Sequence, residues 1–586
     1  MMKKVIPLLL MGVFSTSASS IEANKNTINK ASELAPYQKR SFQDEVFYFV
    51  LPDRFYNGDP SNDLGAPLSD KKRALSHGGL DKTHKGMYHG GDLTGLTEKL
   101  PYLDEMGITA IWLTPILRNQ AMQNGTSGYH GYWILDFTEI DPHLGSNENL
   151  KQFIAQAHKR NIKVFFDIIT NHTADVIRYT ECHGESGLEW LIEEGTCPFK
   201  SLAQMAKGDK YSPFIIPGQE NIKTPQWLNS IDAYHNQGDS HWKGESSIRG
   251  DFAGLDDVDT NSQHVVDGMI DIYKDIIDEF RPDGFRIDTV KHVNMEFWQS
   301  FSPALMKHAQ EIGIENFFMF GEVYSFEPQF LSRFTQEGTL PSVLDFALQG
   351  AIEKALVDQG GTDELANLFA QDHYYKNDQY NANQLVNFTG NHDMGRFAFK
   401  LKQSKFGYSE EESIQRNLLA HALMYFTRGV PVIYYGDEQG FVGDGGDQDS
   451  RQDMMPSLVE TYNDDDLLAT DSTTKENNFD RNHPFYVEFS KYSKLYQQYP
   501  ALRFGEQSTL FSQKEAGLFV IKRELDSSNK AHANAKDMIV VFNTSNASKE
   551  INFDNLNTKV KLVFKSNENS KASLSAPLSF SLYEIK

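Results

Sequence analysis

The stretch "DGFRIDTVKH", Asp283 to His292, begins like a buried β-strand and ends on charged side chains. Its apolar part, Gly284 to Ile287, encloses Arg286, and Asp288 follows directly. Burying a carboxylate is costly unless a cation compensates its charge. Arg286 and Asp288 therefore form either a structural ion pair or part of a cleft in which chemistry takes place. The ends of the neighbouring strands decide between these two interpretations.

Short apolar runs of this kind recur along the chain and are mostly separated by helical patterns. The eight runs begin at Glu45, Ile108, Ile162, Asp283, Phe317, Ser342, Gln384 and Val430. Continuous apolar runs are typical of strands that are buried on both faces. Amphipathic segments that begin at Leu150 and Val265 supply helices between them. This alternation predicts an α/β fold, namely a (β/α)₈ TIM barrel.

Two parts of the chain depart from the alternation. Residues 173–263 follow the third strand and are too many for a plain loop. We interpret them as an inserted domain between two parts of the barrel, 24–172 and 264–495. Residues 496–586 change to short alternating runs, which predict a C-terminal antiparallel β-domain of the sandwich type.

The N-terminus has the order of a secretory signal. Lys3 and Lys4 precede an apolar run from Val5 to Phe14, and small residues follow. We therefore interpret residues 1–23 as a signal peptide and expect export to the periplasm or the medium. An amphipathic first helix is the alternative. No later run reaches the ~20 apolar residues that a membrane span requires, so no membrane attachment is expected after the signal is removed.

Composition narrows the partners further. The net charge of −24 argues against nucleic acid or an anionic membrane, because phosphate binding needs clustered lysine and arginine. Cys182 and Cys197 are the two cysteines, and in an exported chain they predict one local disulfide. Two free thiols are the alternative. We expect a monomer.

Polar side chains gather where the predicted strands end. In a parallel barrel the active site is built at the carboxyl ends of the strands. The polar residues at the ends of strands three, four, five and seven are Asp167, Asn171, His172, Arg286, Asp288, Glu322, His392 and Asp393. Their joint position on one rim predicts a catalytic cleft better than it predicts unrelated structural roles.

Cleavage of a glycosidic bond uses a pair of carboxyl groups. One group must be ionised, while the other must hold a proton for the leaving oxygen and so needs a raised pKa. Arg286 should keep the nearby Asp288 ionised, whereas Glu322 has no basic neighbour in the sequence and is the better acid. On this interpretation Arg286 and Asp288 face the cleft.

Four motifs, "DIITNH", "GFRIDTVKH", "GEVY" and "FTGNHD", resemble in this order the four signature regions of the α-amylase family of glycoside hydrolases. "GYHGYW", Gly128 to Trp133, and "GGDLTGL", Gly90 to Leu96, extend the resemblance over nearly all of the mature chain. It implies a retaining enzyme that cleaves internal α-1,4 bonds of starch and maltodextrins through a glycosyl-aspartate intermediate. Asp288 would be the nucleophile, Glu322 the general acid/base and Asp393 the carboxylate that stabilises the transition state.

The resemblance also implies eight substrate contacts. The sugar being cleaved would be contacted by Tyr132, His172, Arg286 and His392. The neighbouring sugar would be contacted by Asp447 and Arg451, and the leaving group by Lys291 and His292. A structural role is the alternative for each of the outer residues.

Calcium is implied as well, since it prefers several oxygen ligands. One ion would join the barrel and the insert through Asn171, the carbonyl of His292 and Asp257, with Asp256 or Asp259 as alternatives to Asp257. A second would lie in a loop like one of cyclodextrin glucanotransferases; its ligands would be Asn57, Asp59, Asn62, Asp63, Asp92 and the carbonyl of Gly90. An ordinary turn rich in Asn and Asp is the alternative for this loop.

The implied partner is an α-glucan polysaccharide or a maltooligosaccharide. A barrel with one insert and one C-terminal domain favours an exported α-amylase. The same residues would serve a cyclomaltodextrinase- or neopullulanase-like hydrolase or an α-glucanotransferase. A non-catalytic carbohydrate-binding protein is disfavoured, because such relatives typically lose one of the three acidic residues and all three are present here.

Overall fold

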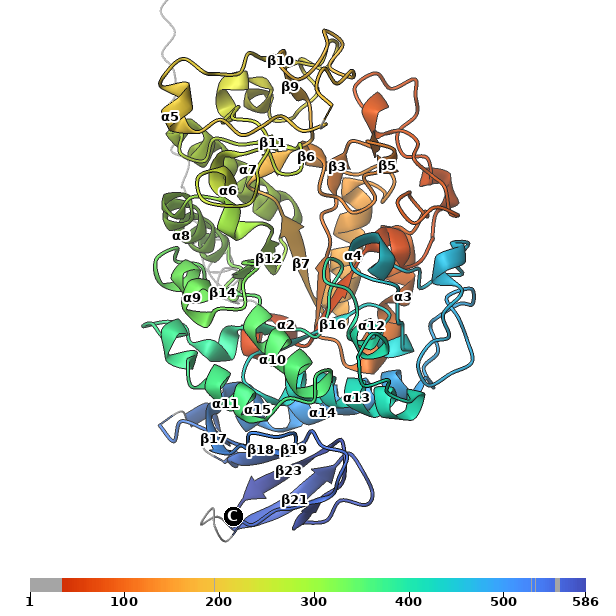
Figure 1. The fold of residues 1–586 in the computed structure, drawn as a ribbon, viewed down its shortest axis with the longest axis vertical. Helices are drawn as coiled ribbons and strands as arrows, with labels where there is room; N and C mark the ends of the chain where they lie inside the picture. Colours follow the sequence, from red (N-terminus) through yellow and green to blue (C-terminus); the bar gives the residue numbers. More distant parts are fainter. Residues whose placement is uncertain (1–33, 194, 529, 533, 554–558) are drawn as a thin grey trace, which may run out of the picture.

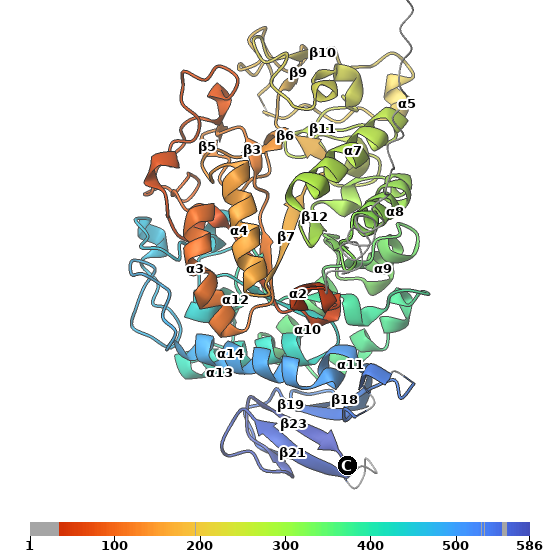
Figure 2. The same cartoon turned by 180° about the vertical axis from the view of Figure 1, so that it is seen from behind.

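The computed structural model describes residues 34–586 except 194, 529, 533 and 554–558, so the predicted signal peptide lies outside the described residues. A barrel of parallel strands is surrounded by helices, with the insert above one end and an antiparallel sheet below the other (Figures 1 and 2). Among the described helices, none combines the length and apolar character that crossing a membrane requires.

Each of the eight predicted apolar runs contains one barrel strand. The strands are β1 Phe47–Val50, β2 Ala110–Leu113, β7 Lys163–Ile168, β12 Gly284–Ile287, β13 Phe318–Gly321, β14 Ser342–Val343, β15 Val386–Asn387 and β16 Val430–Tyr434. They pair in the order β14-β13-β12-β7-β2-β1-β16-β15. Leu344 and Val386 form a parallel bridge between the two end strands, which closes the sheet. The prediction of a TIM barrel is therefore confirmed.

Aromatic side chains fill the inside of the barrel below the rim. Phe47 of β1 packs edge to face on Phe165 of β7 at 4.8 Å and on Phe320 of β13 at 5.8 Å. Phe49 stacks on Trp112 at 3.8 Å. These rings bury a large apolar area in a small volume, and they form a floor on which the polar strand ends stand.

Helices cover the outside of the barrel. The principal ones are α3 Leu93–Met106, α4 Asn147–Lys159, α7 Gln263–Phe280, α8 Met295–Glu311, α9 Pro328–Gln336, α10 Phe346–Leu356, α13 Glu410–Phe426 and α14 Pro484–Gln498. Both helices expected from the sequence are present, as α4 and α7. On α7 the residues Val265, Met269, Ile272 and Ile276 are buried, in the spacing of one helix face. Shorter helices include α2 Pro36–Lys39, α11 Asp363–Phe369, α12 Phe397–Lys402 and α15 Pro500–Phe504.

The segment predicted as an insert contains little regular structure. Its elements are β9 Ile177–Tyr179 paired with β10 Pro213–Ile215, and the short helices α5 Leu202–Met205 and α6 Ser246–Arg249. Near its end β11 Asp256–Asp257 pairs antiparallel with β8 His172–Thr173, which follows the barrel strand β7. Cys182 and Cys197 form a disulfide, as predicted, with Cα atoms 5.9 Å apart.

Short hairpins precede the insert. The loop after β2 contains β3 Leu117–Asn119 paired with β6 Ile134–Ile140, and β4 Met122–Gln123 paired with β5 Thr126–Ser127. They extend the wall of the barrel on the same end as the insert (Figure 1).

The C-terminal sheet is antiparallel, as predicted. Its order is β17 Glu506–Phe511, β18 Leu518–Glu524, β19 Met538–Asn543, β23 Ser579–Ile585 and β21 Val560–Lys565, with a small pair β20 Lys549–Glu550 and β22 Leu574–Ser575 beside it. The short alternating runs predicted for this segment correspond to β18, β19, β21 and β23. We did not predict β17, because this edge strand is largely exposed and lacks an apolar alternation. Phe580 of β23 packs on Phe426 of α13 at 5.0 Å and so attaches the sheet to the barrel.

Candidate active site

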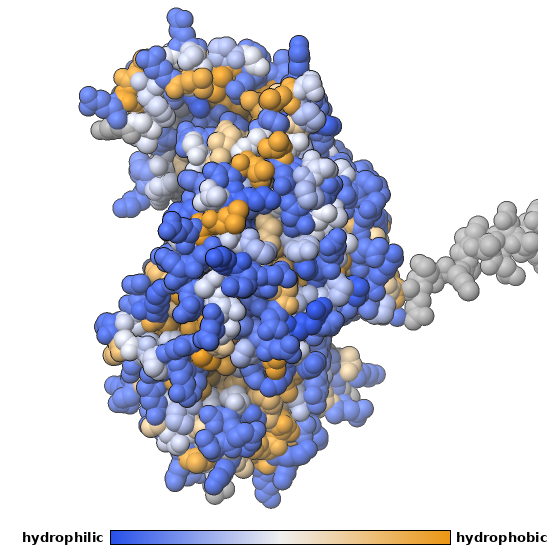
Figure 3. Space-filling view, turned by 90° about the vertical axis from the view of Figure 1, so that its right-hand side faces the viewer, coloured by the Kyte–Doolittle hydropathy of each residue, from blue (hydrophilic) through white to orange (hydrophobic). Residues whose placement is uncertain are grey.

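A cavity of about 510 Å³ opens at the carboxyl ends of the barrel strands. The surface is also hollowed below the end of the molecule that carries the insert (Figure 3). Ten of the eleven residues predicted to act on or contact a sugar line the cavity: Tyr132, His172, Asp288, Lys291, His292, Glu322, His392, Asp393, Asp447 and Arg451. The eleventh, Arg286, lies behind this wall with 1% of its surface exposed.

Arg286 joins three carboxylates. Its Nη1 lies 2.8 Å from Asp288 Oδ1 and 2.8 Å from Asp167 Oδ1, and its Nη2 lies 3.1 Å from Glu322 Oε2. The sheet register accounts for this, because Arg286 is opposite Asp167 on β7 and Phe320 on β13. Arg286 and Asp288 thus form an ion pair in which Asp288 lines the cavity and Arg286 lies behind its wall, so each of the two interpretations of the opening stretch describes one part of the pair.

Asp288 and Glu322 contact the two terminal nitrogens of the same guanidinium, so their carboxyl groups are neighbours in the cavity wall. Glu322 Oε2 also accepts a hydrogen bond from the backbone N–H of Thr289 at 3.2 Å. Thr289 has a φ of 51°, which is strained for a β-branched residue, and such strain concentrates at functional sites. Among the described residues no hydrogen bond engages Asp288 Oδ2 or Glu322 Oε1.

The charge balance differs from the sequence-based expectation. Burial raises the pKa of Asp288 well above its usual value; Arg286 opposes that rise, and Glu322 adds to it. Burial likewise raises the pKa of Asp167 to about 6. Glu322 has no basic neighbour in the sequence, but in the fold Arg286 Nη2 lies 3.1 Å from its Oε2. Asp167 and Asp288 share the guanidinium of Arg286, and the charge of Asp167 adds to the rise in the pKa of Asp288, so these two carboxyl groups titrate jointly.

Asp393 lines the cavity beside Arg451 and His392. Its side chain is 46% exposed, with Oδ1 3.3 Å from Arg451 Nη2 and Oδ2 3.6 Å from His392 Nε2. Arg451 Nη2 is also 2.6 Å from Asp447 Oδ1, and its Nη1 donates to the hydroxyl of Tyr129 at 3.1 Å. These contacts hold Asp447 and Asp393 at one end of the cavity.

Tyr132, His172 and His392 also form part of the cavity wall. The Tyr132 hydroxyl lies 2.8 Å from His392 Nε2 and donates to Asp167 at 3.2 Å. Burial lowers the pKa of His172 to about 3 and that of His392 well below its usual value. Both imidazoles are therefore neutral near pH 7, which suits hydrogen bonding to uncharged hydroxyl groups.

Lys291 and His292 border the end of the cavity next to Glu322. Lys291 Nζ donates to the carbonyl of Tyr324 at 3.1 Å. His292 Nδ1 lies 2.8 Å from the carbonyl oxygen of Ser247, so this end of the barrel rim touches the insert.

The first predicted calcium set lies where the insert rejoins the barrel. The backbone carbonyl of Asn171 accepts from the N–H of Val258 at 2.9 Å, which brings Asn171 next to Asp257. Asp257 Oδ2 is 2.5 Å from His235 Nδ1, while no described residue forms a hydrogen bond with Oδ1. Of the two alternatives, Asp256 accepts from two backbone N–H groups and pairs with Lys223, and Asp259 lies 2.9 Å from His235. Asp257 therefore remains the best placed ligand of the three.

The second predicted set surrounds the loop before α3. The side-chain carbonyl oxygens of Asn57 and Asn62 are buried without a hydrogen-bond partner among the described residues. Gly90 has a φ of 89°, and a Cβ there would lie 2.6 Å from Asp63 Oδ1, so only glycine fits this position. Asp63 accepts from Asn57 at 2.7 Å and lies 3.2 Å from Lys82.

Two predicted ligands of this loop have structural partners. Asp59 Oδ1 accepts from the N–H and hydroxyl of Ser61. Asp92 is the N-cap of α3: it accepts from Gly95 at 2.7 Å and, across the loop, from Asp59 N at 2.8 Å. Asp92 thus shapes the loop by capping, a role that the sequence analysis did not assign.

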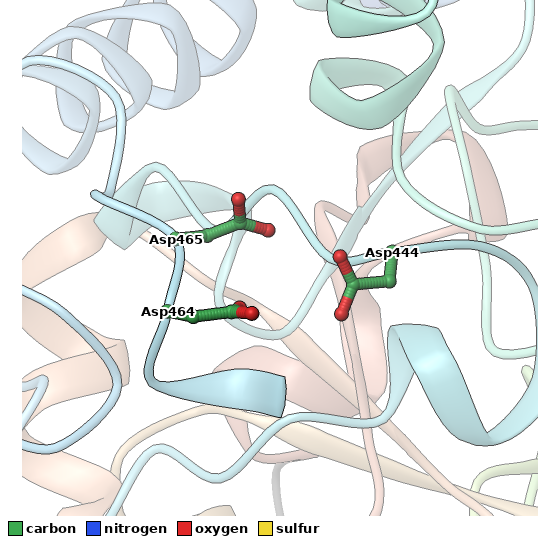
Figure 4. A group of neighbouring side chains, drawn as sticks. All are labelled: Asp444, Asp464 and Asp465. Carbon is green, nitrogen blue, oxygen red and sulfur yellow. The ribbon is translucent and has the colours of Figure 1, made fainter. Parts of the chain in front are cut away.

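Within the part of the chain that the structure describes, a third acidic group comprises Asp444, Asp464 and Asp465, whose ligand atoms lie within 4.8 Å of one another (Figure 4). Asp444 and Asp464 are exposed, and Asp465 pairs with Lys402. Exposed acidic groups of this kind are common without an ion, and we assign no role to it.

Asp167 is the main residue of the site to which the sequence analysis assigned no role. Its position at the end of strand three was noted, but its contacts with Arg286, Tyr132 and the indole N–H of Trp112 depend on the barrel geometry. The sequence shows that Asp167 lies at the end of a strand, but it does not show that Asp167 shares the guanidinium of Arg286.

Comparison with known proteins agrees with this geometry. The family model described as "Alpha amylase, catalytic domain" matches residues 49–499. An α-amylase of Streptomyces lividans is 45% identical over 465 residues, 76% of this chain and 50% of that protein. A β/α-amylase of Paenibacillus polymyxa is 29% identical over 474 residues, 79% of this chain and 31% of that protein. The chain thus spans half or less of the length of these two relatives.

Solved structures resemble the whole architecture. An α-amylase of Geobacillus thermoleovorans, complexed with acarbose, has a TM-score of 0.65 at 25% identity over 94% of this chain and 99% of that one. CldA, described as the first cyclomaltodextrin glucanotransferase with a three-domain ABC distribution, has a TM-score of 0.67 at 26% identity over 92% and 99%.

Proposed function

The chain belongs to the α-amylase family, and from this premise we propose that it is a retaining α-glycoside hydrolase that cleaves internal α-1,4 bonds of starch and maltodextrins. The observation that supports it most is the attachment of Asp288 and Glu322 to one guanidinium at the wall of the cavity. Retaining enzymes need their two carboxyl groups close together, whereas inverting enzymes leave room for a water between them.

The first step is attack by the ionised form of Asp288 on the anomeric carbon, a form that Arg286 favours against the effect of burial. Arg286 holds Oδ1, which leaves Oδ2 free to form the bond. Glu322 donates a proton from Oε1 to the departing glycosidic oxygen, because its Oε2 is engaged by Thr289 and Arg286. The bond to the leaving sugar breaks as the glycosyl-aspartate ester forms.

The second step reverses these roles. Glu322, now ionised, takes a proton from a water, whose oxygen attacks the anomeric carbon and releases Asp288. Asp393 is exposed to the cavity and stabilises the positive charge that develops on the sugar. Neutral His172 and His392 bind hydroxyl groups, and Tyr132 packs on the ring.

A glucanotransferase is the second candidate, since an acceptor sugar can replace water in the second step. The three-domain layout does not separate these functions, because CldA has that layout and is described as a glucanotransferase. A cyclomaltodextrinase- or neopullulanase-like hydrolase remains a further alternative on the same residues.

We propose calcium at both predicted sets. In the loop, the unpaired buried oxygens of Asn57 and Asn62, with Asp59, Asp63 and the carbonyl of Gly90, fit a cation that takes oxygen ligands. At the junction, Asn171, Asp257 and the carbonyl of His292 would supply oxygen ligands from both barrel and insert; the support for this set is the bond from the N–H of Val258 to the carbonyl of Asn171, next to Asp257. Calcium would supply structural cross-linking at these places and no step of the reaction.

We also propose export, a signal peptide at 1–23, and the division into barrel parts 24–172 and 264–495, insert 173–263 and C-terminal domain 496–586. The disulfide between Cys182 and Cys197 supports export, since such bonds persist in oxidising compartments. The substrate is a neutral α-glucan, and a monomer suffices.

The test is to follow products from soluble starch, maltoheptaose, pullulan and cyclodextrin by chromatography, and the first anomer released by proton NMR. We expect maltooligosaccharides from starch with α-configuration at the new reducing end. Release of the β-anomer first would contradict the retaining mechanism, and predominance of longer or cyclic products would favour the transferase.

Glu322→Gln is expected to lower kcat on maltoheptaose by about a thousandfold, because the proton donor is lost, while substrate binding persists. The matched control is Glu327→Gln in the same loop, where the side chain is exposed, and its activity should be that of the wild type. Equal activity of both variants would show that Glu322 is not the proton donor.

A further inference from the structure

Seven arginines among the described residues are fully buried, each with at most 1% of its surface exposed. Six of them pair with a carboxylate, namely Arg54, Arg118, Arg286, Arg396, Arg416 and Arg428. The seventh, Arg523 of β18, forms no ion pair with a described residue. Its Nε and Nη1 donate to the backbone carbonyls of Gly505 at 3.2 Å and Phe426 at 3.4 Å. A buried charge without a counter-charge is costly, so Arg523 differs from the other six in what stabilises it.

Further hydrogen-bond donors surround Arg523. Gln507 lies directly opposite it in the antiparallel pairing of β17 with β18, so their Cβ atoms are about 5 Å apart. The side chain of Gln507 also accepts from the backbone N–H of Arg428 at 2.7 Å, which brings a second arginine to the same place. The donors that are buried here without an acceptor among the described residues are Arg523 Nη2, Arg428 Nη2, Gln507 Nε2 and the hydroxyl of Tyr375.

Two carboxylates hold Arg428 in this position. Its Nε donates to Asp372 at 2.9 Å, and its Nη1 donates to Asp345. Asp372 begins the 3₁₀ helix Asp372–Tyr375, which places the hydroxyl of Tyr375 in the same region. Burial raises the pKa of that hydroxyl, so it remains a donor near pH 7. Both carboxylates are engaged by Arg428, and neither forms an ion pair with Arg523.

The charge of Arg523 decides what kind of ligand these donors fit. Burial lowers the pKa of Arg523 to about 10, and the nearby charge of Arg428 acts in the same direction. The guanidinium is therefore still protonated near pH 7. A water would accept some of the hydrogen bonds but would leave this charge uncompensated. A small inorganic anion accepts the bonds and also supplies the counter-charge, and hydrogen bonds between ionised partners are the stronger kind.

We propose that these four donors bind one small inorganic anion, of the size of chloride, between the barrel and the C-terminal sheet. Arg428 and Tyr375 belong to the barrel, whereas Arg523 and Gln507 belong to the sheet, so the ion links the two parts. Arg428 precedes β16 and lies at the amino end of that strand, away from the cavity at the carboxyl ends. The sheet lies at the end of the barrel opposite the insert (Figure 1). The ion has a structural role, and the inference does not depend on the proposed reaction.

The experiment measures the melting temperature while chloride replaces gluconate at constant ionic strength and constant calcium, because gluconate is too large for a buried site. In the wild type, chloride from none to about 200 mM should raise the melting temperature by about 2 to 5 °C and then reach a plateau. Arg523→Met should abolish this response. Without chloride the variant should melt no lower than the wild type, since it removes a buried charge that has no counter-charge.

Arg416→Met is the matched control, because it removes an equally buried arginine that has its own carboxylate, Glu412. It should lower the melting temperature but keep the full response to chloride. An equal response in Arg523→Met, or no response in the wild type, would overturn the anion site. Bromide in crystals of the wild type gives a test that does not require the variant to fold. Its anomalous signal should lie between the guanidinium groups of Arg428 and Arg523, and the absence of a peak there would show that water alone accepts from these donors.

Discussion

The two acid-rich regions that the sequence marked for calcium differ in how their charges are compensated. In the segment 251–259, Asp256 pairs with Lys223, and His235 lies between Asp257 and Asp259. In the loop 57–63, the amide oxygens of Asn57 and Asn62 are buried without a partner among the described residues.

This difference teaches that an acidic motif alone does not distinguish a metal site from a network of internal ion pairs. Lys223 is 33 residues away from Asp256 in the sequence, and His235 is 22 residues away from Asp257. The cation that compensates a carboxylate can come from anywhere in the fold. An unpaired buried oxygen is the more specific sign of a missing cation, because leaving such a group unsatisfied is costly.

The largest expected effect follows from removing an internal cation. Lys223→Met should lower the free energy of unfolding by about 3 to 5 kcal/mol, because it leaves the buried carboxylate of Asp256 without its cation. Denaturant unfolding measures this change. Lys207→Met, at an exposed lysine of the insert, is the control and should change stability by less than about 0.5 kcal/mol. Equal small effects would mean that the backbone N–H groups alone compensate Asp256.

A smaller effect is expected when calcium is removed from the loop. Chelation should lower the melting temperature of the wild type, with about 2 to 3 kcal/mol of stabilisation lost if the ion is present at a hundred times its Kd. Asn62→Ala should destabilise the protein in calcium but not in chelator, since the buried oxygen is then no longer needed.

Calorimetric titration with calcium measures independently how many ions the Asn62→Ala variant binds. It should bind one calcium ion fewer than the wild type. If the melting temperature of the wild type is the same with and without chelator, and the chelated protein is shown to be free of metal, both proposed calcium sites are contradicted. The loop is then an ordinary turn.

The smallest effect concerns a carboxylate that has hydroxyl partners in place of a cation. Glu438 is fully buried and accepts from Tyr48 and Tyr102 at 2.7 and 3.0 Å. Burial raises its pKa to about 7, above the ordinary 4.5. Its contribution to stability is therefore complete below pH 4.5 and is lost as the pH rises through 7.

Glu438→Gln should remove about 2 kcal/mol of the stability difference between pH 5.5 and pH 8. Unfolding in denaturant at the two pH values measures it. Glu411→Gln, at an exposed position of α13, serves as control and should leave the difference unchanged. If the Glu438 variant kept the full pH dependence, another buried carboxylate would be responsible.

The barrel and its rim were predictable because their signals are local. Each buried strand lies in an apolar run; Asp288 and Glu322 follow their strands directly, and Asp393 comes shortly after β15. The carboxyl ends of parallel strands meet at one face, so sequence position alone brings these residues together.

The features that were missed depend on contacts between distant segments. The sharing of Arg286 with Asp167 and Glu322 requires the register of three strands. The edge strand β17 carries no apolar pattern, and its place in the sheet depends on pairing with β18. Asp92 is the exception, because it caps α3 through Gly95, only three residues later; an aspartate directly before the first helical turn is a local signal that the sequence analysis overlooked.

The pairing of β8 with β11 has a consequence for how such molecules diversify. Because His172 lies opposite Asp257, the chain leaves the barrel and returns to it at neighbouring points. Everything between can be lengthened, shortened or exchanged with another protein without moving the barrel strands. The two-residue pairing of β8 with β11 is thus a fixed point of attachment, at which inserts of different length can join the same barrel.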